Sequence, residues 1–178
     1  MVRQTHGFAR SCVRGLCAAL LLSSCAAAAE TIDRVLAVVA GQLITLTDVT
    51  AARDLGLQSA DNVPDPVRAI LSKLIDRELI LAEVDRYAPP EPTAEAVDRE
   101  VGRIRARFPS PDALAATLAR SGVDEKHLLE MVRQDLRIRA YLDQRFASAQ
   151  ERRQTLMDEW VTGLRRRGEV IDLYLSGR

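Results

Sequence analysis

Few residues of this sequence are of the types that perform chemistry in enzymes. His127 is the only histidine after position 29, and the three cysteines, Cys12, Cys17 and Cys25, all lie before position 30. Zinc sites and histidine-activated nucleophiles need such side chains in groups. The GxSxG, GxGxxG and P-loop motifs are also absent from the sequence. We therefore expect no enzymatic activity, no cofactor and no metal site.

Carboxylates are the remaining candidates for acid–base chemistry. Asp76, Glu78, Glu83 and Asp85 lie on one predicted helix, with arginines among them. Pairing with a basic residue one helical turn away explains such carboxylates better than catalysis does. His127 falls in the first turn of another predicted helix, which favours a solvated side chain. We interpret all five as surface residues.

The charge pattern does not favour a nucleic-acid-binding protein. The sequence has 25 basic and 25 acidic residues. Three arginines and no acidic residue lie in residues 1–29, so the remainder has 22 basic against 25 acidic residues, a net charge of −3. Most arginines are interleaved with acids, and residues 165–167, three arginines, end a predicted helix, where the helix dipole favours cations. We expect no nucleic-acid partner.

The elements that would position any binding site are organised around residues 33–49, DRVLAVVAGQLITLTDV. Residues 35–39 and 43–46 are predicted strands, because they are rich in β-branched and aliphatic side chains. Ala40 and Gly41 between them have the length of a two-residue hairpin loop. Ala40 tolerates the required positive φ poorly, so the turn type stays open. Thr47 is predicted to cap a helix over residues 48–57.

The caps Asp65, Thr93 and Asp124, together with prolines and apolar periodicity, predict five helices after the one over 48–57. The first of these five helices, over 66–87, has the broadest apolar face and is expected to be the central core helix. A terminal strand is expected over 169–175, with Ile171, Leu173 and Leu175 on its buried face. Its only available partners are in the N-terminal hairpin, so the chain ends should meet. The predicted fold is mainly α, about six helices with a small antiparallel sheet. The other predicted helices span 94–108, 111–120, 124–146 and 150–167.

Residues 1–29 are typical of a secretory signal peptide. A basic start is followed by an apolar run at 16–22 and by three alanines at 27–29. The run is well short of the roughly 20 residues that a transmembrane helix needs. We expect cleavage after Ala29, export to the periplasm, and one domain over residues 30–178. That domain contains no cysteine, so it has no disulfide framework.

Residues 22–25, LSSC, offer a second route of processing. They resemble the lipobox of bacterial lipoproteins, in which the cysteine is lipidated and becomes the N-terminus. A lipid anchor at Cys25 and a membrane-anchored lipoprotein are therefore the alternative to a free periplasmic protein, and the sequence leaves both open.

Several phrases of the sequence resemble the SurA-type periplasmic chaperones. DRVLAVVAGQLITLTDV, LSKLIDRELILAEVDRY and the run from FPSPDALAATLARSGVDEKHLLEMVRQDLRIRAYLDQRF are similar to the N-terminal domain of that family. DEWVTGLRRRGEVIDLYL resembles the C-terminal helix and strand that return to complete the same domain. The resemblance covers nearly all of residues 30–178. It implies a chaperone that binds unfolded outer-membrane or secreted proteins.

The sequence departs from this family at two places. Ala40-Gly41 replaces the turn with Asn or Asp that is common in the family. Family members usually carry parvulin-type prolyl isomerase domains before the terminal helix, whereas three residues here join Phe146 to Gln150. The prolyl isomerase activity of the family is therefore not expected.

Two classes of function remain open from the residues. The first is a module that binds extended polypeptide in an aliphatic groove; Phe108, Leu114, Leu118 and Tyr141 are its candidate residues, because the short helix over 111–120 has few predicted partners. The second is a structural or adaptor protein of the cell envelope. A prolyl isomerase is the least favoured third interpretation.

The signal peptide generates the first testable prediction. The exported protein should begin at or near Glu30, because small residues precede it and no transmembrane segment follows. Intact-mass measurement of the protein recovered from the cell envelope checks this. A mass that begins at Cys25 and includes acyl chains would establish the lipoprotein instead.

Overall fold

The computed structural model describes residues 33–175, so the predicted signal peptide and Cys25 lie outside the described residues. Within them, six α-helices accompany a three-stranded antiparallel sheet, which confirms the predicted fold class. In this part of the chain, no helix combines the length and the apolar character needed to cross a membrane.

The N-terminal hairpin forms as predicted, from β1 (Val35–Val39) and β2 (Gln42–Thr45). Ala40 and Gly41 both take positive φ, 48° and 82°, the combination of a type I′ turn. This conformation matches the twist of the strands, and the Ala40 N–H donates to the Glu169 carbonyl at 3.0 Å. The C-terminal segment thus helps to hold a turn that alanine alone disfavours.

Helix α2 (Leu46–Asp54) begins two residues earlier than expected. Its N-cap is Thr45, so the prediction of Thr47 as the cap was wrong. Thr45 and Asp48 form a capping box: the Asp48 N–H donates to the Thr45 hydroxyl at 3.3 Å, and the Thr45 N–H donates to the Asp48 carboxylate at 2.7 Å. A capping box needs the carboxylate three residues after the cap, a spacing that Asp48 has from Thr45 only.

The remaining helices begin where the sequence places their caps. Asp65, Thr93, Ser110 and Asp124 each accept a hydrogen bond from the backbone N–H three residues later. The predicted last helix differs at its start, where a 3-10 turn, η1 (Gln150–Arg152), precedes it. The α-helices are α3 (Pro66–Tyr87), α4 (Ala94–Arg105), α5 (Pro111–Arg120), α6 (Glu125–Arg145) and α7 (Arg153–Arg167).

The N-terminal hairpin and the C-terminal strand pair in one sheet with the strand order β2-β1-β3. Strand β3 spans only Val170–Asp172, so it is shorter than the predicted strand over 169–175. The predicted burial of this strand was wrong, because its faces are reversed. Ile171, Leu173 and Leu175 are 58%, 46% and 79% exposed, whereas Val170 and Tyr174 pack against the core.

The register explains this reversal. Val170 lies opposite Val39, whose side chain is buried, so Ile171 lies opposite Val38 and points away from the helices. Polar contacts hold the same register: the Tyr174 hydroxyl donates to the Asp65 carboxylate at 2.9 Å, and Asp172 pairs with an arginine of α3. Because both faces of this segment carry apolar residues, the sequence pattern alone does not show which face is buried.

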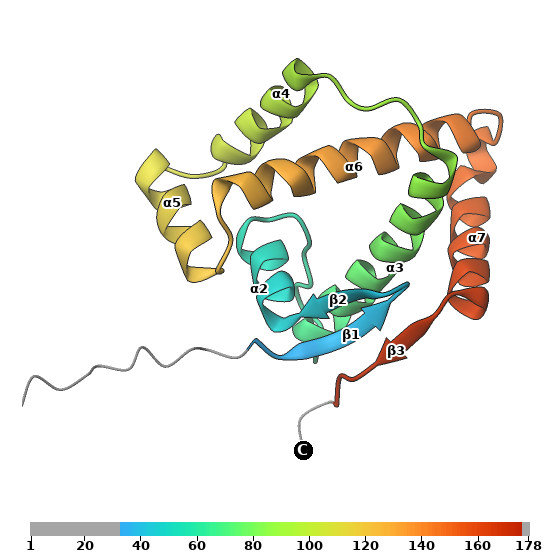
Figure 1. The fold of residues 1–178 in the computed structure, drawn as a ribbon, viewed down its shortest axis with the longest axis horizontal. Coiled ribbons are helices and arrows are strands. Elements are labelled where there is room, and N and C mark those ends of the chain that lie inside the picture. The colour runs from blue at the N-terminus through green and yellow to red at the C-terminus, as the bar shows by residue number, and fades with distance from the viewer. Residues whose placement is uncertain (1–32, 176–178) are drawn as a thin grey trace, which may run out of the picture. The chain divides into compact units, whose positions relative to one another are not determined.

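Helix α3 is the central core helix, as predicted. Its residues Ile70, Leu71, Ile75 and Leu79 form one apolar cluster with the inward side chains of β1 and with Leu164 of α7. A second cluster joins α2, α4, α5 and α6. In Figure 1 the sheet lies at the lower side with the helices above it, and α4 and α5 lie next to α6.

The junction of α7 and β3 yields a prediction on stability. A Cβ atom at Gly168 would lie 2.5 Å from Leu79 Cδ2 and 2.9 Å from the Leu164 carbonyl. We expect Gly168→Ala to destabilise the fold by about 1–3 kcal/mol through overpacking. Gly102, in the middle of α4, has no atom within 4 Å of such a Cβ, so Gly102→Ala should stabilise by about 0.5–1 kcal/mol.

Thermal melts of both variants beside the unchanged protein check this prediction. Melting temperatures should move in opposite directions for the two substitutions. Equal stability of Gly168→Ala and the unchanged protein would mean that the α7–β3 junction does not pack against Leu79 as described.

Candidate functional site

The four residues predicted to bind peptide do not form an open groove. Leu114, Leu118 and Tyr141 are buried, and Phe108 is half-buried. Leu114, Leu118 and Phe108 lie together in the cluster around α4, α5 and α6, and they also line a shallow hollow of about 570 Å³ beside α5. Tyr141 lies in a separate cluster with Leu81 of α3. The structure thus brings three of the four together, largely as core.

The exposed apolar surface lies instead on the outer side of the sheet. Leu43, Val38 and Ile171 face one another in a row across β2, β1 and β3. Leu43 is 60% exposed, so no element within residues 33–175 covers this side of the row. Leu173 and Leu175 continue the apolar surface along the C-terminal segment. We call these five residues the open sheet face.

The two sides of the sheet differ because α2 and α3 pack on one of them (Figure 1). Helix α3 contacts both strands of the hairpin, and α2 contacts β2. Ala37, Val39 and Ile44 point toward these helices and are buried. Large apolar side chains that remain exposed as a connected group are a common mark of an interaction surface.

A cleft adjoins the open sheet face at β2, and we call it the β2 cleft. It has a volume of about 260 Å³ and lies between β2, α2, α3 and α6. Leu43, Ile44, Leu57, Leu74 and Met131 supply its apolar lining. Because Leu43 belongs to both surfaces, the cleft and the open sheet face are continuous.

An arginine-centred network forms the polar wall of the β2 cleft. Arg77 of α3 donates to Asp135 Oδ1 at 2.8 Å, to Glu78 Oε1 at 2.7 Å and to Gln134 Oε1 at 3.0 Å. Its guanidinium also reaches the Met131 carbonyl at 3.4 Å. Asp135, Gln134 and Met131 belong to α6, so this network holds α3 and α6 together along one side of the cleft.

Glu78 is the titratable group most affected by this environment. Burial raises its pKa, since the charged form loses solvation, and the nearby carboxylates of Asp48 and Asp135 raise it further. Arg77 opposes the shift by its charge and hydrogen bond. His127 also lines the cleft and has an exposed side chain, as predicted.

The other carboxylates of α3 pair differently from the prediction. Asp76 accepts from Arg165 of α7 at 2.5 Å, and Asp85 accepts from Arg137 of α6 at 2.8 Å. Only Glu83 pairs within its own helix, with Arg86. The predicted pairing one turn along the helix was therefore wrong for Asp76 and Asp85, because neighbouring helices bring arginines closer than the next turn does. It was also wrong for Glu78, which is largely buried and pairs with the adjacent Arg77.

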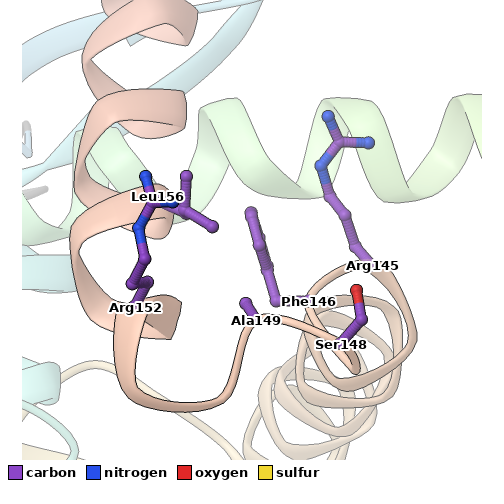
Figure 2. A pocket seen from close by; sticks show the side chains of 6 residues that line it. All are labelled: Arg145, Phe146, Ser148, Ala149, Arg152 and Leu156. Atoms are coloured by element: carbon purple, nitrogen blue, oxygen red, sulfur yellow. The ribbon is translucent and has the colours of Figure 1, made fainter.

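A second hollow, of about 610 Å³, lies at the junction of α6 and α7. Arg145 and Phe146 line it on one side, and Arg152 and Leu156 line it on the other (Figure 2). The Arg145 guanidinium also lies 4.8 Å from the ring centroid of Trp160. Trp160 is half-buried against residues of α3 and α6.

Comparison with known proteins does not assign this chain to a family. No protein-family model matches it, and no curated protein matches it. Among residues 33–175, no group of three or more histidine, cysteine or carboxylate side chains is arranged to hold a metal ion.

Sequence reasoning missed the open sheet face and the β2 cleft. The alternation of Ile171, Leu173 and Leu175 signalled an apolar strand face, and this signal was interpreted as core. The cleft joins β2 to α6, which lies far along the chain, so no local pattern marks it.

The raised pKa of Glu78 generates a prediction on pH dependence. Because the folded protein holds the Glu78 proton more tightly than the unfolded chain does, ionisation of Glu78 costs stability. The cost is absent below the ordinary pKa near 4.5 and appears as the pH rises through the folded pKa. We expect Glu78→Gln to gain melting temperature relative to the unchanged protein as the pH rises from 4.5 to 8.

Melting curves across this range check the trend. Glu159→Gln on the outer side of α7 makes the same change in net charge and serves as the control. A difference between Glu78→Gln and the unchanged protein that does not vary with pH would contradict the prediction.

Proposed function

We propose that this protein is a chaperone-like module that binds extended segments of unfolded polypeptide without ATP. The observation that carries the proposal is the open sheet face: Leu43 and Ile171 are 60% and 58% exposed and lie in one cross-strand row. Exposing such side chains forfeits about 1.5–3 kcal/mol each relative to burial, so a transient partner that covers them gains much of this energy.

The small size of this surface favours weak, reversible binding. Five apolar side chains, on three short strands and the segment that follows β3, bury much less area than a stable protein complex does. We expect micromolar affinity, near −8 kcal/mol, so that release needs no energy source. The aliphatic character of the side chains suits segments of many sequences, since such surfaces adapt to their partners.

The resemblance to the SurA-type chaperones supports the choice of clients. In that family a C-terminal helix and strand return to the N-terminal domain, and here β3 pairs with β1. We therefore propose unfolded outer-membrane or secreted proteins as partners and the periplasm as the location. The proposal includes no prolyl isomerase activity. Family members usually carry the parvulin-type domain before the terminal helix, and here only three residues separate Phe146 from Gln150.

A pair of substitutions on the open sheet face tests the function. Leu43→Thr with Ile171→Thr removes apolar surface while keeping residues that favour strands. We expect this double variant to lose most of its ability to suppress aggregation of a urea-unfolded outer-membrane protein, measured by light scattering after dilution. Its melting temperature should change by only a few degrees, because both side chains are exposed.

Val63→Thr provides the matched control. Val63 is 39% exposed and lies in the loop between α2 and α3, so it is not part of the open sheet face. This variant should protect the client as well as the unchanged protein does. Failure of the unchanged protein to suppress aggregation would overturn the chaperone proposal and leave the adaptor, which would use the open sheet face for one fixed partner.

A further inference from the structure

The outer edge of β2 offers backbone groups for another strand. In the order β2-β1-β3, β2 is an edge strand of the described sheet. Val39 and Gln42 close the two-residue hairpin and form its hydrogen-bonded pair, so the next pair, Val38 and Leu43, is not hydrogen-bonded. The N–H and C=O of Leu43 therefore point away from β1. The next outward N–H, that of Thr45, already donates to Asp48.

A strand added at this edge would divide its side chains between two surfaces. Successive side chains of a strand point to opposite faces. On β2, Ile44 points toward the helices and lines the β2 cleft, while Leu43 points outward on the open sheet face. In an added strand, residues i and i+2 would enter the cleft, and residue i+1 would extend the row formed by Leu43, Val38 and Ile171.

The cleft differs in chemistry from the open sheet face. Its apolar lining and volume of about 260 Å³ suit aliphatic groups, but its rim carries the carboxylates of Asp48, Glu78 and Asp135 against the one guanidinium of Arg77. Arg77 bonds one oxygen of Asp135 and one of Glu78. Their second oxygens are not engaged by Arg77, so the rim favours a cationic side chain over an anionic one.

We propose that the β2 cleft recognises a triplet in which an apolar residue separates an aliphatic residue from a basic one, in an extended polypeptide that pairs with Leu43 of β2. The aliphatic side chain fills the apolar part of the cleft, the central side chain covers the open sheet face, and the basic side chain reaches the oxygens of Asp135 and Glu78 that Arg77 does not bond. This inference rests on the proposed function and names the segments that the binding module prefers.

Three labelled heptapeptides of matched length test the triplet. The first contains Leu-Val-Arg between Ser and Thr residues, the second has citrulline in place of arginine, and the third has the order Leu-Arg-Val. Fluorescence anisotropy with the full protein should give about tenfold weaker binding for the citrulline peptide, the size expected for one charge-assisted hydrogen bond. The reordered peptide should weaken similarly, because its arginine points away from the cleft. High salt should reduce the citrulline difference.

A variant of the protein tests the site independently of the peptides. Asp135→Asn should abolish the preference for arginine over citrulline. Asp98→Asn, on the exposed side of α4, makes the same change in net charge and should keep the preference. Thermal melts of both variants establish that they are folded.

The outcomes separate this inference from the proposed function. Equal binding of all three peptides overturns the triplet and leaves the chaperone proposal standing. Failure of every heptapeptide to bind, with an unfolded outer-membrane protein still protected from aggregation, also overturns the triplet. Loss of protection as well would overturn both. A tenfold preference that disappears in Asp135→Asn and persists in Asp98→Asn supports it.

Discussion

Backbone pairing on both sides of β1 is the constraint on which the rest of this fold depends. β2 follows β1 through a two-residue turn, but β3 comes from the far end of the chain. Without β3, one edge of β1 would be unpaired. Helix α7 buries only Leu164 fully, so it would then be held to the rest of the fold mainly by its contacts with α3. The pairing also sets the register that turns Val170 inward and Ile171 outward. The apolar surface proposed for binding is thus a consequence of how the core closes.

Ion pairs between helices set the position of α6 and α7 against α3. Arg77 links α3 to α6 beside the β2 cleft, Arg137 links them again at Asp85, and Arg165 joins α7 to Asp76. Half-exposed pairs of this kind contribute about 0–1 kcal/mol each, so packing supplies most of the stability. The positions that these pairs impose on the helices matter more than their energy. The β2 cleft lies between β2 and α6, so its shape depends on where α6 is held against α3.

An exposed apolar sheet with an open edge carries a risk of aggregation, and this fold limits it. β2 and β3 contain four and three residues, so each edge offers few backbone groups to another strand. The Thr45 N–H donates to the Asp48 carboxylate, so on this edge the N–H and C=O of Leu43 are the groups that can pair with an incoming segment. Short edges of this kind favour brief contacts with extended chains over the growth of a larger sheet.

Local signals in the sequence predicted the helices and strands, whereas the buried face of β3 depends on contacts that form only in the folded protein. Caps such as Asp65 and Asp124, followed by apolar residues at helical spacing, mark helices through local hydrogen bonds and periodicity, and these predictions are confirmed. The face of β3 was predicted wrongly because both of its sides carry apolar residues, so the choice depended on Val39, Asp65 and other distant partners. The β2 cleft was missed for the same physical reason: it forms between residues that become neighbours only when the chain folds.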